Sequence, residues 1–320
     1  MSELIAASFY RICRLYDSPL ADWPSREVLE VPSQAAPTGE QGGAKELQPA
    51  ASAPSSGPRP KASAHGTEKL YLDNTYLFSL SGAKILTCAE DSGTATLVLD
   101  KTIFHPQGGG QPSDLGTIST PNGGTAVFEV SMVKEDRATG IVGHQGSMVK
   151  GGLAELKSSS GGLVLGVDEA RRRECARVHS AGHALDVAMI MVGHKHLKAT
   201  KGYHFVDGPY VEYEGKLSDD EKAALPASLT AKIRELASTG IDSHLRYVSK
   251  AEALELCPGS DLSGMQDGAM VRVVSVAGGW CPCGGTHVST LKELGEVAVT
   301  KVKSKKNTLK VSYVLGPLLG

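Results

Sequence analysis

Aromatic residues are scarce in this 320-residue sequence, at 5% of positions, so aliphatic side chains must supply most of the packing. Long apolar runs are missing too: none approaches the roughly 18 residues that a membrane-spanning helix needs, and we expect no membrane span. Neither sign of charge is in large excess, because the formal net charge is −2. A polyanionic partner would therefore have to meet a local basic surface, which the average charge neither suggests nor excludes.

Cysteine is sparse as well. The six cysteines are scattered except for the last two: Cys13, Cys88, Cys175, Cys257, Cys281 and Cys283. A chain of this size does not need disulfide bonds to stabilise it, so this usage favours a reducing compartment, and we expect a cytoplasmic protein in which any special role of cysteine is metal binding. Near the N-terminus, Arg11 and Arg14 are not followed by a cleavable apolar core, so we expect no secretory signal.

Composition separates two N-terminal segments from the rest. Residues 33–66 consist mainly of Ala, Ser, Pro and Gly, and Leu47 is their one large apolar residue. Such a segment cannot bury enough surface to offset its ordering entropy, so we expect a disordered linker. Residues 1–32 form an N-terminal extension, in which apolar residues between positions 4 and 31 have roughly the spacing of a short docking helix.

Residues 67–161 have the pattern of a small antiparallel β-barrel domain. Short alternating runs separated by turn-forming residues predict strands at 70–72, 83–88, 94–99, 116–119, 125–133 and 139–142. Between two of these strands lies a glycine-rich motif, His105 to Asp114, which reads HPQGGGQPSD. Three successive glycines give a backbone that can approach another surface closely.

Residues 167–316 alternate helices with antiparallel strands, which predicts an α/β two-layer sandwich and, with the barrel, an α+β fold. A helix from 169 to 192 follows Asp168, a plausible N-cap. The further predicted elements are a hairpin at 203–213, a helix at 218–238, a strand at 244–248, a helix at 250–256, a strand at 270–276 and a hairpin formed by 295–303 and 308–315.

Two pairs of metal-ligating residues lie far apart in this second domain. His179 and His183 are four residues apart in the predicted helix, so both rings project from one face. Cys283 and His287 are also four apart, in a glycine-containing loop. Three imidazoles and one thiolate are a tetrahedral set that zinc prefers. Ordinary core or surface histidines would be the alternative for the first pair alone, and Cys281 is an alternative ligand to Cys283.

The residues around these pairs narrow the chemistry. Between His179 and His183 the sequence has no glutamate to serve as the base of an HExxH metalloprotease, so proteolysis is disfavoured. Among the other histidines, His204 is a candidate for lining the pocket. We interpret the remaining ones as surface or structural residues: His194, His196 and His244.

With these residues identified, the chain resembles the free-standing alanyl-tRNA editing proteins of the AlaX type, relatives of the alanyl-tRNA synthetase editing domain. The resemblance rests on three motifs in the family's order: Phe104 to Asp114, His179 to His183, and Cys283 to Val288. It spans most of residues 67–316 and leaves residues 1–66 outside. It implies a β-barrel followed by an editing domain that binds one zinc ion through His179, His183, Cys283 and His287.

The resemblance also implies an activity, deacylation of alanine tRNA that carries serine or glycine. It associates the glycine-rich motif with serine recognition, which points to Gly108, Gly109, Gly110 and Gln111. No ATP-binding aminoacylation module precedes this region, so we expect editing in trans by a protein that is most simply a monomer. Thr200 and His204 are candidate catalytic groups in the pocket, and no general base is assigned.

Two basic runs are candidate contacts to the tRNA backbone, although the simpler interpretation of either run alone is a solvated face. The residues proposed to contact RNA are Arg171, Arg172, Lys301, Lys303, Lys305 and Lys306, with Arg177 and Lys310 beside them. Two other functions remain open. The chain could be a zinc-stabilised module that binds tRNA or a protein without hydrolysis, or it could edit threonine tRNA, whose synthetase carries a related domain.

Overall fold

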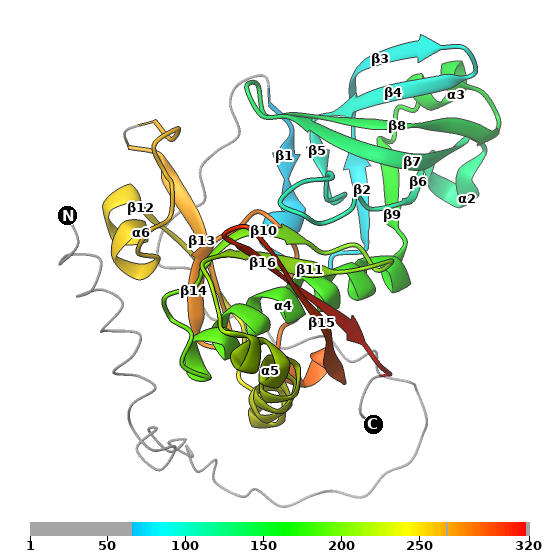
Figure 1. The fold of residues 1–320 in the computed structure, drawn as a ribbon. Helices are drawn as coiled ribbons and strands as arrows, with labels where there is room; N and C mark the ends of the chain where they lie inside the picture. Colours follow the sequence, from blue (N-terminus) through cyan, green and yellow to red (C-terminus); the bar gives the residue numbers. More distant parts are fainter. Residues whose placement is uncertain (1–65, 267, 318–320) are drawn as a thin grey trace, which may run out of the picture. The chain divides into compact units, whose positions relative to one another are not determined.

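The computed structural model describes residues 66–266 and 268–317, which form a mixed α/β fold with four β-sheets (Figure 1). The predicted N-terminal extension and nearly all of the predicted linker lie outside these residues. Every helix in the described ranges is too short or too polar to cross a lipid bilayer.

The largest sheet has seven antiparallel strands in the order β2-β9-β6-β7-β8-β4-β3. Its strands are β2 (Ser79–Ala83), β3 (Ile85–Asp91), β4 (Thr94–Leu99), β6 (Gly116–Ser119), β7 (Val127–Asp136), β8 (Ile141–Lys150) and β9 (Leu163–Val167). The strands run antiparallel, as predicted. Apolar side chains from across the sheet fill one core, among them Leu97, Phe104, Phe128 and Leu165.

This sheet is a curled half-barrel and not the predicted barrel. Its two edge strands, β2 and β3, are consecutive in the chain and separated only by Lys84. Because two consecutive strands lie at opposite edges of the sheet, the sheet must curl to bring these edges together. No hydrogen-bond ladder joins β2 to β3 in the described residues, so the barrel is not closed. The backbone N–H of Lys84 donates instead to the Asp100 carboxylate (2.7 Å).

Residues 70–72 form a 3-10 helix, η2 (Leu70–Leu72), where a strand was predicted, and that prediction is wrong. The backbone N–H groups of Asp73 and Asn74 both donate to the carbonyl of Leu70, at 3.2 and 3.4 Å, which closes a helical turn. The flanking strands β1 (Glu68–Lys69) and β5 (Lys101–Thr102) pair in parallel. Short α2 (Pro121–Gly124) and α3 (Leu153–Lys157) connect strands of the half-barrel.

Helix α4 (Glu169–Met191) follows the half-barrel and begins as predicted, because the Asp168 side chain accepts a hydrogen bond from the N–H of Arg171 (3.0 Å). Helix α5 (Asp219–Thr239) begins with a capping box of Ser218 and Glu221 and ends at Gly240, whose φ is 63°. Helix α6 (Lys250–Leu256) and strand β13 (Met270–Val276) have the predicted bounds. The remaining elements are β12 (His244–Ser249), β14 (Gly279–Pro282) and η3 (Leu291–Leu294).

A four-stranded sheet lies against α4 and α5. Its order is β10-β11-β16-β15, with β10 (Lys198–Tyr203), β11 (Tyr210–Glu214), β15 (Val297–Lys305) and β16 (Thr308–Leu315). Two tyrosines from its buried face donate hydrogen bonds to α4, Tyr213 to Asp186 (2.7 Å) and Tyr313 to the carbonyl of Val178 (2.9 Å). Helix α5 packs on both β15 and α4. A sheet and two helices therefore form two layers.

A buried ion pair joins the half-barrel to helix α4. The Arg172 guanidinium donates to the Asp114 carboxylate, with Nε at 2.9 and 3.0 Å from its two oxygens, and to the carbonyls of Ile103 (2.6 Å) and Thr75 (2.9 Å). Both charged side chains are at most 1% exposed. All described residues belong to one compact unit, and a domain boundary between residues 161 and 167 stays a prediction.

Candidate metal centre

Helix α4 presents His179 and His183 on one face, as their spacing predicts. The two ring centroids are 4.9 Å apart and nearly parallel, with 25° between the planes. Both rings lie in the middle of a capped 23-residue helix, where the backbone is held by hydrogen bonds on both sides. Helix geometry alone therefore fixes half of the site.

The loop after β14 brings in Cys283 and His287. Backbone bonds hold it at both ends, because Cys283 N–H donates to the carbonyl of Arg272 (3.3 Å) and His287 N–H donates to the Thr75 hydroxyl (3.2 Å). Between them, Gly285 lies so close to helix α4 that a Cβ there would be 2.2 Å from Cε1 of His179. Only glycine allows this approach, which explains the residue in the motif.

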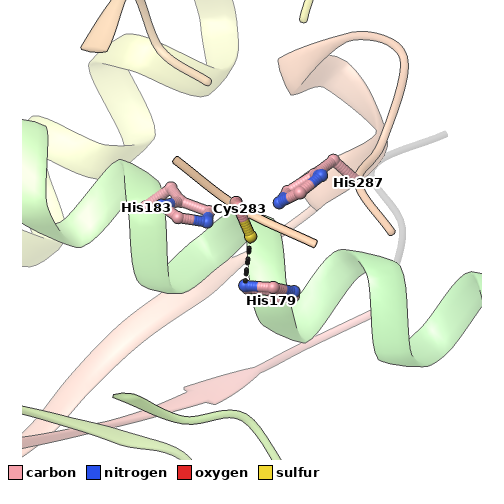
Figure 2. A group of neighbouring side chains, drawn as sticks. All are labelled: His179, His183, Cys283 and His287. Atoms are coloured by element: carbon pink, nitrogen blue, oxygen red, sulfur yellow. Dashed lines mark hydrogen bonds between the residues drawn. The ribbon is translucent and has the colours of Figure 1, made fainter. Parts of the chain in front are cut away.

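The four side chains converge although the two pairs are about a third of the chain apart. One ligand atom from each of His179, His183, Cys283 and His287 lies within 4.8 Å of every other. Figure 2 shows the three rings and the sulfur pointing toward a common centre, with Cys283 Sγ 3.5 Å from Nε2 of His179. Three nitrogens and one sulfur in this arrangement can hold a metal ion.

The chemical state of these groups fits that use. The Nε2 atoms of His183 and His287 are buried and make no hydrogen bond, although buried polar atoms are normally paired. Burial lowers the pKa of His183 to about 4, and it lowers the pKa of His179 and His287 well below the usual range. Neutral rings with unshared nitrogen lone pairs are the form in which histidine binds metals.

Gln111 of the glycine-rich motif orients His179. Its side chain is fully buried, and its Oε1 accepts hydrogen bonds from Nδ1 of His179 (2.7 Å) and from the N–H of Thr286 (3.0 Å). Because an amide oxygen can only accept, Nδ1 of His179 carries the proton and Nε2 is left free to face Cys283. Gln111, predicted to bind substrate, is thus placed behind a metal ligand.

Cys281 has the corresponding place behind His183. Its sulfur lies 3.4 Å from Nδ1 of His183, while Nε2 of that ring is the atom without a partner. Cys281 is the alternative ligand that the sequence offers, and the group of four that converges contains Cys283 instead. Burial raises the pKa of both thiols, so metal binding by Cys283 would release a proton.

The glycines of the motif form a tight turn that delivers Gln111. Gly108 and Gln111 exchange two backbone hydrogen bonds, at 3.1 and 2.9 Å, and the two central residues, Gly109 and Gly110, have φ of 57° and 82°. Such a turn favours glycine at both positions. A Cβ on Gly110 would lie 2.4 Å from the carbonyl oxygen of Gly202, so this glycine also permits contact with β10. Serine recognition by these glycines stays a prediction.

His204 lies beside the four ligands. Its ring stacks on His179, with centroids 4.6 Å apart, and burial lowers its pKa to about 3. Tyr313 Oη is 2.8 Å from Nδ1 of His204 and gives its own proton to a backbone carbonyl, so Nδ1 of His204 must donate. The ring fits between two glycines: a Cβ on Gly182 or on Gly202 would lie 2.3 Å from its atoms.

Thr200, the other candidate catalytic group, is exposed on β10, and its hydroxyl donates to the carbonyl of Glu212 (3.2 Å). A place in the pocket therefore stays a prediction for Thr200. Arg272 is a neighbour of the site that sequence reasoning missed. Its guanidinium donates to the carbonyls of Cys283 and Leu72, the latter at 2.9 Å. The signal for it was a single charged residue in the otherwise uncharged strand β13.

The basic residues divide into accessible and buried ones. The lysines of β15 and its turn are exposed: Lys301, Lys303, Lys305 and Lys306. Arg171 is partly exposed, with Nε donating to the carbonyl of Ser113 (3.3 Å). Arg172 is fully buried in its ion pair and cannot reach a phosphate, so we withdraw it from the residues proposed to contact RNA. A run of arginines in sequence does not reveal which one turns inward.

The sequence matches known proteins over about two thirds of its length. A family described as "Threonyl and Alanyl tRNA synthetase second additional domain" matches residues 271–310, which contain Cys283 and His287. Similar proteins include the alanine–tRNA ligases of Methanobrevibacter smithii (29% identical over 232 residues, 69% of this chain and 24% of the ligase) and Cupriavidus necator (29% over 245 residues, 72% and 25%).

A third similar protein is the alanine–tRNA ligase of Methanoculleus marisnigri, which is 32% identical over 211 residues, 64% of this chain and 21% of the ligase. The chain thus spans about a quarter of the length of the curated relatives that it matches. These matches confirm the relationship to alanyl-tRNA synthetases that the three motifs indicate.

Proposed function

We propose that this chain, a relative of the editing domain of alanyl-tRNA synthetases, is an aminoacyl-tRNA deacylase that hydrolyses alanine tRNA charged with serine and, to a lesser degree, with glycine. The observation that carries the proposal is the convergence of His179, His183, Cys283 and His287 within 4.8 Å in a chain related to enzymes named for charging alanine tRNA. The reaction breaks the ester between amino acid and terminal ribose with one water.

The donor set points to zinc as the bound metal. Three imidazole nitrogens and one thiolate sulfur are ligands that zinc takes in tetrahedral sites. When bound, zinc supplies a Lewis acid that can hold the substrate's amine, polarise its carbonyl or acidify water. Four protein ligands fill a tetrahedral shell, so any direct contact with substrate requires a displaced ligand or an added coordination position.

The logic of the substrate follows from pocket energetics. A pocket that accepts alanine rejects serine or glycine by only about 1–3 kcal/mol, because the difference is one small group. A second site that hydrogen-bonds the serine hydroxyl discriminates in the other direction, since alanine would leave buried polar groups without partners. Thr200 and the glycines of the turn, Gly108, Gly109 and Gly110, are our candidates for that recognition.

Residues around the ligands orient two of the rings at the site. Gln111 fixes the tautomer and angle of His179, and Tyr313 fixes those of His204. Burial is the main cause that lowers the pKa of His183. Arg272, which adds a positive charge beside the site, is the second cause. An arrangement in which several rings are held in advance positions a reactive ester without spending binding free energy on ordering the protein.

The deciding experiment compares mischarged tRNAs on the intact protein. Purified protein should release serine from serine-charged alanine tRNA with turnover, and a folded Cys283→Ala variant should not. Serine-charged threonine tRNA, tested beside it, should be a poorer substrate; faster hydrolysis of the threonine tRNA would assign the chain to that tRNA instead. Protection of the ester without turnover would make the chain a binding module and would refute a hydrolase.

A further inference from the structure

One face of the four-stranded sheet is basic. Cross-strand partners share a face, and the pairings Lys201–Glu212–Lys310–Lys303 and Lys198–Glu214–Thr308–Lys305 form two rows across it. Lys301 joins this face opposite Ser312. The opposite face, which carries Tyr213 and Tyr313, is buried against α4. On the solvent side, six lysines therefore accompany two glutamates: Lys198, Lys201, Lys301, Lys303, Lys305 and Lys310 against Glu212 and Glu214.

Three aromatic rings are stacked at one end of this face. Tyr203 is the cross-strand partner of Tyr210, with ring centroids 5.2 Å apart and 16° between the planes. Phe205 stacks on the other side of Tyr203 at 4.5 Å and 12°. All three are partly exposed. The ammonium of Lys310 lies 3.3 Å from the centroid of Tyr210 and joins the stack to the lysines.

The backbone connects the stack directly to the metal centre, because Tyr203 and His204 are consecutive residues. Tyr203 ends β10 on the solvent side, and the next residue, His204, reaches the buried side, where it bonds Tyr313 and stacks on His179. Asp207, which accepts from the Tyr203 hydroxyl (3.3 Å), is the acidic group at the edge of the stack. The end of β10 therefore carries a ring of the stack on one face of the sheet and, one residue later, a ring of the metal centre on the other.

We propose that Tyr203, Phe205 and Tyr210 form a stacking platform for the unpaired 3′ end of tRNA, with the lysines of the same face holding its phosphates. The proposal rests on the proposed function, which requires the aminoacylated 3′ end of the tRNA to enter the metal centre. Single-stranded RNA is bound by aromatic rings on which bases stack, beside basic groups that follow the backbone. Both parts occur here on one face, and the chain passes directly from Tyr203 on that face to His204, whose ring stacks on the ligand His179.

Stacked aromatic pairs also stabilise hairpins, so binding must be measured apart from stability. The probe is uncharged alanine tRNA, with and without its unpaired 3′ nucleotides, and the readout is the dissociation constant from filter binding or anisotropy. Tyr210→Leu and Phe205→Leu are each expected to weaken binding of the intact tRNA about tenfold, and to leave binding of the shortened tRNA unchanged. Tyr210→Phe keeps the ring and should bind normally.

Phe78→Leu is the matched control, because this partly exposed ring also lies under a cation, Arg173 at 5.0 Å, but on the half-barrel. Its binding should equal that of the unchanged protein. The platform is refuted if folded Tyr210→Leu and Phe205→Leu bind both tRNAs normally, or if they lose affinity equally for both. Because the tRNA is uncharged, a failed platform with intact hydrolysis rejects this proposal alone, and a working platform without hydrolysis rejects only the deacylase.

Discussion

Replacing Gln111 by leucine should weaken zinc binding although all four ligands remain. The variant removes the acceptor that fixes the Nδ1 proton of His179, and it leaves that N–H and the N–H of Thr286 buried without partners. Loss of a group that orients a ligand costs about 10- to 100-fold in metal affinity, or roughly 1.4–2.7 kcal/mol. Two unpaired buried donors cost about 1–3 kcal/mol each in the free energy of unfolding.

Competition with a chelator measures the zinc affinity of each variant, and urea unfolding of the zinc-free protein measures its stability separately. Gln111→Glu keeps an acceptor for both N–H groups and should retain most of the affinity. Gln107→Leu, at an exposed position of the same motif, is the control and should change neither quantity. A folded Gln111→Leu protein that binds zinc within twofold of the unchanged protein would refute the orienting role.

Three further predictions concern other residues. Gly285→Ala should lower the zinc content measured by elemental analysis, since its Cβ would meet a ligand ring at 2.2 Å, whereas Gly284→Ala has open space and should bind a full equivalent; equal contents would contradict this account. Arg172→Met should lower the free energy of unfolding in urea by about 3–5 kcal/mol, because it leaves a buried carboxylate unpaired, and Arg173→Met, at an exposed pair, by less than about 1 kcal/mol. Similar losses of unfolding free energy in the two variants would show that the buried Arg172–Asp114 pair is not what joins the half-barrel to helix α4. Neutralising one accessible lysine should reduce the slope of log affinity for tRNA against log salt by about 0.7–0.9, and an unchanged slope would remove that residue from the interface; the lysines are Lys301, Lys303, Lys305 and Lys306.

Local patterns predicted the elements whose ends are encoded by nearby residues. Asp168 begins α4, Gly240 ends α5, and α6 and β13 have the predicted bounds, because caps and apolar periodicity act over a few positions. Residues 70–72 show the limit of this reasoning. Their alternation fits a strand, yet two hydrogen bonds to the carbonyl of Leu70 make a helical turn.

The candidate site was predictable as a set of ligands but not as an assembly. Spacing indicates that His179 and His183 share a face, and chemistry suggests Cys283 and His287 as their complement. The sequence near Gln111 does not indicate its hydrogen bond to His179, which is 68 residues away in the chain. That contact depends on how the half-barrel packs on α4. The burial of Arg172 depends on the same packing, so the arginine run looked uniformly solvated in sequence.

The ring of His204 sits in a slot between Gly182 and Gly202, each of which would overlap it at 2.3 Å if it carried a methyl group. These three positions, from a helix, a strand and the strand's end, therefore form one steric set. A larger residue at either glycine demands a smaller one at 204, and a smaller residue at 204 leaves a hole beside His179. Natural variants should therefore exchange the three residues together, and an engineered change at any one of them should be accompanied by changes at the other two.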